Sequence, residues 1–165
     1  MDSIFLDVKI LAAYIEKKFL DEKNNKISPL KLQKSLYFLF AFWGGFIIKN
    51  RNLDHSKEQE VNYDDLSPFL FNSNIEAWYY GPVIPEVYRC TDIMSYRNDQ
   101  FIDDLDYRVR EFIDDLLKQL FDVSDFTLVN ISHADNIWKK YYNDDDDIHN
   151  NVIPSQEIIN EYAEK

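Results

Sequence analysis

The sequence predicts a mainly α fold: a single compact helical domain with a short extended segment near residues 75–83. Apolar residues recur every three or four positions over most of the 165 residues, which is the spacing of one face of an α-helix. Hydrophobic residues make up 45% of the chain and aromatic residues 16%, enough for a buried core. Only 3 glycines occur, too few for glycine-rich nucleotide loops. We expect one domain over residues 1–165, since a chain of this length buries roughly two-thirds of its unfolded surface.

The first predicted helix carries a single apolar stripe, and the polar run 21–26 is expected to end it. The residues of this stripe are Ile4, Val8, Leu11, Ile15 and Phe19. Ser28 and Pro29 predict the start of a second helix, because serine caps helix N-termini and proline is favoured in the first helical turn.

The second helix is predicted to be exposed at first and buried later. Lys31, Lys34 and Ser35 are expected to face solvent over its first two turns. Residues 36–48 are apolar on every side, which predicts the buried centre of the fold. The pair Gly44-Gly45 within this run is expected to let another helix approach closely.

The rest of the chain predicts further helices joined by polar segments. Residues 49–74 are interpreted as a long connection with a short helix near residues 63–71. Residues 75–83 favour an extended piece that ends in a Gly-Pro turn. Further helices are expected from Pro85 through Val87, Tyr88 and Met94, over Leu105–Leu120, over Phe126–Tyr142, and after a capping Ser155.

The sequence contains none of the common catalytic or metal-binding motifs: no P-loop, GxGxxG, HExxH or CxxC. We therefore predict no enzyme, no catalytic or metal-binding residues and no cofactor. Ser132 and His133 are adjacent, and adjacent helical residues point in different directions, so they are interpreted as structural residues. Cys90 is interpreted as a buried structural cysteine. The run Asp144–Asp147 with His149 lacks the glycine and glutamate of an EF-hand and is interpreted as a solvated loop.

The charge is concentrated in the second part of the chain. Residues 1–97 hold 13 acidic and 12 basic side chains, whereas residues 98–165 hold 17 acidic and 6 basic ones, which together give the net charge of −12. An acidic surface repels phosphates and attracts basic proteins, so direct nucleic-acid binding is not expected. A merely solvated acidic surface is an equally weighted alternative.

The sequence predicts a cytoplasmic protein without a membrane segment. The apolar run at 36–48 is shorter than the ~20 residues that span a bilayer, and the N-terminus lacks a basic leader with a cleavage site. The single cysteine, Cys90, fits a reducing compartment.

The segment IEAWYYGPVIPEVY at residues 75–88 has an unusual composition. Three consecutive aromatic residues, Trp78, Tyr79 and Tyr80, precede Gly81 and Pro82, which fix the backbone. Aromatic side chains on a stiff turn are good interface anchors because they lose little side-chain entropy on binding. A purely architectural turn, with Trp78 and one tyrosine in the core, is the alternative interpretation.

This segment, together with SPLKLQKSLYF at residues 28–38, resembles the Panacea domain, also called the SocA-like antitoxin domain. Members show an (S/T)-P-x-K-L-Q-K-x-x-Y start and an E-A-W-x-x-G-P-V-x-P-x-V-Y block. They continue into helices that end near a tryptophan preceded by a Ser/Thr-His pair, as in Ser132, His133 and Trp138 here. The resemblance spans about residues 5–162.

The resemblance implies a mostly helical type II antitoxin that neutralises a co-encoded toxin by direct binding. In the SocA branch it also implies an adaptor that delivers the toxin to a ClpXP-type protease. The acidic second half fits a basic toxin. The residues we assign to partner binding are Trp78, Tyr79, Tyr80, Gly81, Pro82, Asp103, Asp104, Asp114 and Asp115.

Two other function classes stay open. One is an acidic inhibitor that mimics nucleic acid and blocks a defence nuclease, which an aspartate array spaced like phosphates would support. The other is an uncharacterised enzyme with a pocket around Tyr80, Ser132 and His133.

Overall fold

The computed structural model describes residues 2–52, 61–143 and 151–165. More than half of the chain is helical, which confirms the mainly α class. The elements are α1 (Val8–Lys23), α2 (Pro29–Arg51), β1 (Ile75–Trp78), β2 (Gly81–Val83), α3 (Pro85–Tyr88), the 3-10 helix η1 (Ile93–Tyr96), α4 (Asp99–Asp103), α5 (Tyr107–Leu120), α6 (Asp125–His133), α7 (Asn136–Tyr141), β3 (Val152–Ile153) and α8 (Ser155–Ala163).

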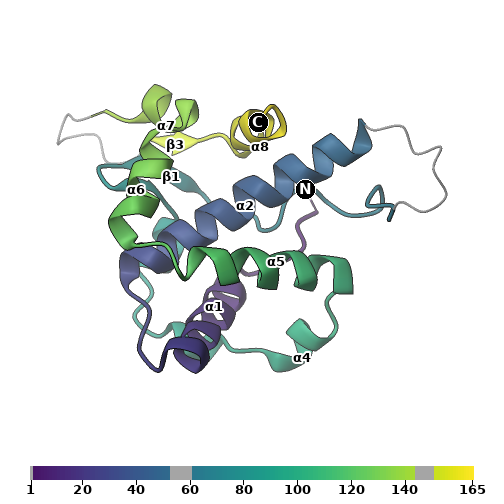
Figure 1. The fold of residues 1–165 in the computed structure, drawn as a ribbon, viewed down its shortest axis with the longest axis vertical. Coiled ribbons are helices and arrows are strands. Elements are labelled where there is room, and N and C mark those ends of the chain that lie inside the picture. The colour runs from purple at the N-terminus through teal and green to yellow at the C-terminus, as the bar shows by residue number, and fades with distance from the viewer. Residues whose placement is uncertain (1, 53–60, 144–150) are drawn as a thin grey trace.

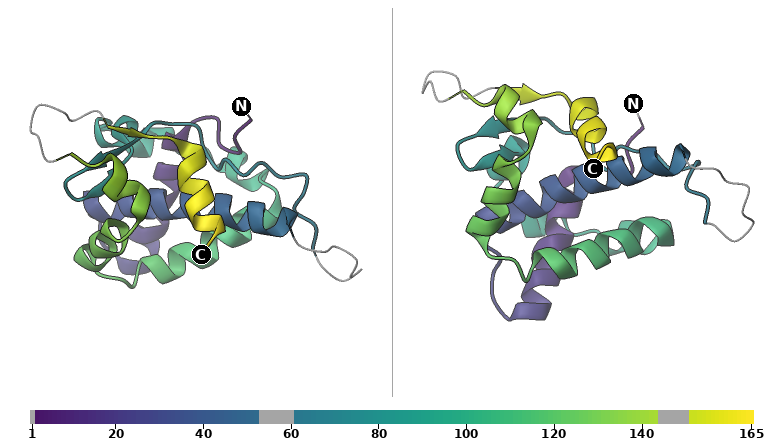
Figure 2. Two further views of the ribbon diagram at one scale, coloured as in Figure 1. Left: turned by 90° about the horizontal axis from the view of Figure 1, so that it is seen from above. Right: turned by 45° about the horizontal axis from the view of Figure 1, so that its top comes forward.

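Helix α2 is the buried axis of the fold. It runs between α1 and α5 on one side and α8 with the small sheet on the other (Figures 1 and 2). Its predicted start is confirmed, because Ser28 Oγ accepts from the Lys31 main-chain N–H at 3.0 Å and Pro29 occupies the first turn. Residues 36–48 form the centre as predicted, except that Phe42 is 40% exposed and Phe46 and Ile48 are only partly buried.

The prediction that Lys31, Lys34 and Ser35 face solvent is wrong, since all three are buried. The loop after α5 and the start of β2 cover this side of α2. Lys31 Nζ donates to the Phe121 main-chain oxygen at 3.2 Å, and Lys34 Nζ donates to the Pro82 main-chain oxygen at 2.8 Å. Main-chain acceptors from distant segments thus replace water around the first turns of α2.

The predicted extended segment is a β-hairpin. Strands β1 and β2 pair antiparallel, with Trp78 opposite Gly81, so Tyr79 and Tyr80 form a two-residue turn. Gly81-Pro82 therefore begins β2 rather than forming the turn, and Gly81 has a φ of 103°, which favours glycine. Strand β3, which the sequence did not reveal, pairs with the other edge of β1.

Several predicted helix boundaries are corrected. Helix α1 begins at Val8, after the Asp7 cap, so Ile4 lies outside it. The described part of segment 63–71 contains no helix, and the helix that begins at Pro85 ends at Tyr88, well before Met94. The N-cap of α8 is Pro154, not Ser155. None of the helices in the described residues combines the length and apolar character that a membrane span needs.

The predicted helix over Phe126–Tyr142 is divided into α6 and α7 at Ala134–Asp135. The Asp135 carboxylate is buried and accepts from the hydroxyls of Tyr37 and Tyr162, each at 2.6 Å. Lys165 Nζ donates to its other oxygen at 2.7 Å. The break in the helix thus supplies the acceptor that joins α2 to α8.

The close approach expected at Gly44 and Gly45 is confirmed, and the approaching helix is α8. A Cβ on Gly45 would lie 2.7 Å from the Tyr162 carbonyl carbon and 2.8 Å from its Cβ. A Cβ on Gly44 would meet the Ile159 side chain and the Pro68 main-chain oxygen. Contacts this short cannot form without displacing backbone, so the two glycines set the distance between α2 and α8.

We predict that Gly45→Ala destabilises the protein by about 1–3 kcal/mol, because the added methyl group forces α8 away from α2. In an open helix the same change would stabilise by up to about 1 kcal/mol, so the sign of the effect is informative. Urea unfolding measures it, with Asn130→Ala, on the exposed side of α6, as the control that should change little. A Gly45→Ala variant as stable as the parent would contradict the packing described here.

Candidate partner-binding surface

The two sequence motifs contact each other through side-chain hydrogen bonds to backbone. The Gln33 amide bonds both polar atoms of the Ile84 main chain: its Oε1 accepts from the N–H at 2.7 Å and its Nε2 donates to the oxygen at 3.2 Å. One helical position further on, Lys34 binds the Pro82 oxygen. Helix α2 therefore fixes β2 and the start of α3.

The other side of the hairpin is held by α6 and α7. Trp138 Nε1 donates to the Trp78 main-chain oxygen at 2.8 Å, and His133 Nε2 lies 2.8 Å from the Tyr79 main-chain oxygen. The Trp138 ring stacks on His133 with centroids 4.1 Å apart. Since the backbone on both sides of the turn is hydrogen-bonded, the turn presents its side chains on a rigid support.

The turn carries an exposed aromatic surface. Tyr79 is 67% and Tyr80 is 49% exposed, and their rings meet edge to face at a centroid distance of 4.9 Å. Trp78 is half-buried and packs edge to face against the exposed Tyr88 at 5.0 Å. We call these four residues the aromatic turn surface.

Gly81 and Pro82, which the sequence assigned to partner binding, are buried. A Cβ on Gly81 would meet Ser132 Oγ, and it would lie 3.0 Å from Lys34 Cε. Their part is therefore to support the turn, whereas the side chains of Tyr79 and Tyr80 are free to contact a partner. Trp78 has both a supporting and an exposed part. Its indole N–H donates to Glu76 Oε1 at 2.9 Å, while part of its ring reaches the surface.

The acidic residues assigned to partner binding lie far from the turn, around α4 and α5, toward the opposite end of Figure 1. Most are engaged within the chain. Asp114 accepts from the Tyr14 hydroxyl at 2.5 Å, Asp103 pairs with Arg110 at 3.4 Å, and Asp104 accepts from Gln100 at 3.0 Å. Asp115 is exposed. The acidic run Asp144–Asp147 and His149 lie outside the described residues.

Ser132 and His133 have separate tasks in the structure. Ser132 is buried and its hydroxyl donates to the Val129 main-chain oxygen at 2.7 Å, while His133 is directed at the turn backbone. Neither residue belongs to the lining of the cavity beside Cys90, of the cavity beside Arg97, or of the two cavities between α2, α5 and α8. The described residues also contain no group of three potential metal ligands.

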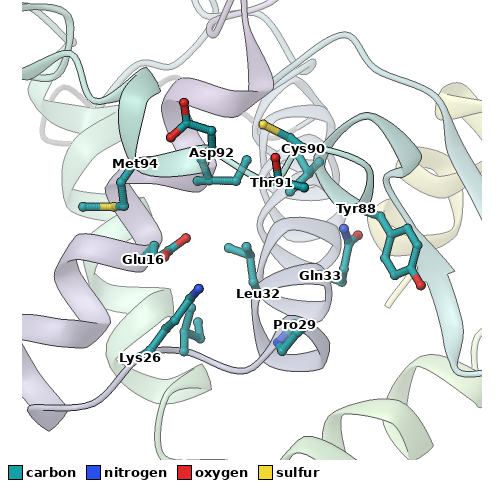
Figure 3. Close-up of a pocket in the computed structure, with 13 residues that line it drawn as sticks. Glu16, Lys26, Pro29, Leu32, Gln33, Tyr88, Cys90, Thr91, Asp92 and Met94 are labelled. Atoms are coloured by element: carbon teal, nitrogen blue, oxygen red, sulfur yellow. The ribbon is translucent and has the colours of Figure 1, made fainter.

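Cys90 is only partly buried and lines a cavity of about 570 Å³ between α1, the start of α2 and residues 87–94 (Figure 3). Glu16 and Lys26 line one side of this cavity and Cys90, Thr91 and Asp92 line another, while Leu32 contributes an apolar side chain. No histidine belongs to the described residues that line this cavity, so nothing beside Cys90 there offers an imidazole base for a thiol nucleophile.

The electrostatics beneath the hairpin depend on Lys34. Burial lowers the pKa of this amine to about 7, because its only hydrogen-bond partner among the described residues is a neutral carbonyl. A carboxylate close by would have opposed the shift. The support of the hairpin thus contains a lysine that titrates near neutral pH.

The protein is mainly α-helical, and helix α2 supports a β-hairpin whose turn carries exposed aromatic side chains. The family model described as antitoxin SocA-like, Panacea domain, matches residues 58–139. This match confirms the resemblance to the Panacea family that the sequence motifs indicated. The family suggests a role in a toxin–antitoxin system, a protein toxin as partner and no enzymatic activity of its own. Neither the curated proteins nor the solved structures contain a match to this chain.

Sequence reasoning missed three parts of the surface: the support from Gln33 and Lys34, the contact between Trp78 and Tyr88, and the Trp138 indole that bonds the hairpin. The available signal for the support from Gln33 and Lys34 was that these two long polar side chains come just before the fully apolar run at residues 36–48. On a helix of that kind both sides are covered, so polar groups there need acceptors within the protein.

We predict a pH-dependent stability that Lys34 controls. From about pH 7 to about pH 9.5 the unfolded chain keeps this proton, with a pKa near 10.4, whereas the folded chain releases it. Stability therefore rises with pH over this interval. Lys34→Met should make the rise shallower, as measured by urea unfolding across the interval. Identical pH profiles for the two proteins would show that Lys34 stays charged when folded.

Proposed function

We propose that this protein is a cytoplasmic antitoxin that neutralises a co-encoded toxin by binding it directly. The observation that carries the proposal is the pair of exposed tyrosines, Tyr79 and Tyr80, on a hairpin turn whose backbone is hydrogen-bonded from both sides. A preorganised turn loses little conformational entropy on binding. Exposed tyrosines on such a turn are suited to fill pockets on a partner protein.

The charge supports a basic toxin as the partner. With a net charge of −12, most of it in residues 98–165, the protein attracts cations and repels phosphates. Exposed charges accelerate encounter, whereas buried aromatic anchors slow dissociation. Delivery of the bound toxin to a ClpXP-type protease is compatible with this scheme and is part of the proposal.

The nucleic-acid mimic is less well supported by the described aspartates. On α5 the aspartates lie between Arg110 and Lys118, and Arg108 at the start of this helix pairs with Asp65 at 2.9 Å and Asp106 at 2.7 Å. A phosphate-like array needs uncompensated charges at regular spacing. The paired residues of α4 and α5 do not offer one.

Co-expression tests the proposal. We predict that the product of the gene next to this one arrests growth when it is expressed alone, and that this chain restores growth and co-purifies with it. A variant with both Tyr79→Ala and Tyr80→Ala should rescue less well, while Phe126→Ala, an exposed aromatic residue at the far end of α6, should rescue fully. If neither neighbouring gene is toxic or co-purifies, the proposed function is wrong.

Rate measurements separate the two contributions to binding. We predict that Tyr79→Ala or Tyr80→Ala raises the dissociation rate of the toxin by a factor that corresponds to about 2 kcal/mol. Neutralising Asp103, Asp104 and Asp115 together should instead slow association and flatten its salt dependence. Asp114 is left unchanged because it bonds Tyr14. Surface plasmon resonance at several salt concentrations gives both rates; unchanged rates in folded variants would place the interface elsewhere.

A further inference from the structure

An apolar groove lies between α2, α5 and α8, away from the aromatic turn surface. It consists of two adjoining cavities of about 480 Å³ and 260 Å³. Phe46, Phe112 and Asp115 line both cavities, so the two form one continuous depression. Pockets of roughly 300–1,000 Å³ accommodate drug-sized ligands, so the groove has room for several side chains of a partner.

The floor of the groove is aromatic. Phe46 and Phe112 meet with ring centroids 5.4 Å apart, and Tyr63 closes one end against Phe46 at 4.9 Å. At the other end Phe42, which is 40% exposed, packs edge to face on Tyr162 at 4.8 Å. An aromatic surface that remains open within the most apolar helix of the protein is unusual, because such side chains gain free energy from burial.

The walls of the groove follow helical spacing. Phe42, Phe46 and Lys49 lie at positions i, i+4 and i+7 of α2. Helix α5 contributes the opposite wall, with Glu111 and Asp115 one turn apart beside Phe112. Two parallel ridges of this kind form the surface on which a third helix packs.

On the α5 side of the rim the uncompensated charge is negative. Glu111 and Asp115 are exposed and have no ion-pair partner within the part of the chain that the structure describes. Arg108 is paired with Asp65 and Asp106, and Lys165 is paired with Asp135. Lys49, on the α2 side of the rim, donates to the Lys165 main-chain oxygen and keeps its charge. A partner that enters the groove therefore gains most from carrying cations toward α5.

We propose that this groove binds an amphipathic α-helix of the partner protein, with its apolar face on Phe42, Phe46 and Phe112 and its basic flank against Glu111 and Asp115. Grooves between helices select ligand helices by apolar anchors at i, i+3 or i+4, and i+7. This inference rests on the proposed function, since it assumes that a protein partner exists. It adds a second contact, on the α5 side of the molecule, to the one at the aromatic turn surface.

Another copy of this chain is a poorer occupant. Two chains that each carry a net charge of −12 repel one another, and the rim that would meet them is acidic. The same repulsion disfavours a nucleic acid in the groove. A basic helix satisfies both the apolar floor and the acidic rim.

A synthetic peptide tests the proposal without the toxin. The probe is a fluorescein-labelled peptide of about 14 residues, comparable to α5, with leucines at i, i+4, i+7 and i+11 and lysines along one flank. We expect binding by fluorescence anisotropy, a gain of helical circular dichroism on binding, and binding that weakens with added salt. A variant with Glu111→Lys and Asp115→Lys should bind about tenfold more weakly.

The matched control has the same number of charge reversals at two exposed acidic residues outside the groove, Glu22→Lys and Asp92→Lys, and should bind the peptide nearly as well as the parent. Thermal unfolding of both variants confirms that they are folded. The proposal is overturned if the peptide does not bind, if a version with glutamate in place of lysine or a scrambled version binds equally well, or if both variants lose equal affinity. It is also overturned if the protein forms a dimer that Phe42→Glu dissociates.

These outcomes are separable from the proposed function. If the chain rescues growth through Tyr79 and Tyr80 but does not bind the peptide, the antitoxin function stands and the proposal that the groove binds a helix is rejected. If the chain binds the peptide in the groove but neutralises no neighbouring gene product, the groove stands as a docking surface and the proposal of a toxin partner is rejected.

Discussion

The structure depends on the hydrogen bonds that two buried polar side chains of α2, Gln33 and Lys34, form away from water. Gln33 and Lys34 lie on the part of α2, residues 31–41, that is buried on every side, and leaving a buried donor without a partner costs about 1–3 kcal/mol. Both residues find main-chain acceptors, at Ile84 and Pro82. That requirement places β2 against the first turns of α2, and the two-residue connection to β1 then has to project outward. The exposure of Tyr79 and Tyr80 is thus a consequence of a buried hydrogen-bond requirement.

Support and contact are divided between different residues. Gly81, Pro82 and Lys34 are buried and fix the backbone of the hairpin, while Trp138 and His133 bond it from the opposite side. Substitution of a supporting residue changes stability and the position of the turn, whereas substitution of an exposed tyrosine changes only what the turn contacts. The same division applies at α8, where Gly45 and the Asp135 carboxylate fix the helix that borders the groove.

Residues close together in the chain predicted the helices and the extended segment. The features that the sequence did not predict depend on contacts with distant residues. The Ser28-Pro29 start of α2, the amphipathic α5 and the extended segment at 75–83 each depend on residues close together in the chain, and all three are confirmed. The burial of Lys31 and Lys34 was missed because lysine is rarely buried and its acceptors lie 90 and 48 residues away. The break at Asp135 has the same origin, since its partners Tyr37 and Tyr162 belong to α2 and α8. Of the candidate site, the sequence located the aromatic turn but not the pairing of Asp114 and Asp103, which depends on Tyr14 and Arg110.

The segment that matches the family, residues 58–139, is not self-sufficient in this fold. Its hairpin is bonded by Gln33 and Lys34, the apolar face of its α5 packs against α2, and its Asp135 is held by hydroxyls at positions 37 and 162. Without α2, the main-chain groups at Pro82 and Ile84 would lose these hydrogen bonds, and the backbone that orients the turn would lose one of its two supports. Both the aromatic turn surface and the groove therefore require α2, although the first motif of that helix lies outside the matched segment. The unit that forms both surfaces is accordingly larger than the segment by which the family is detected.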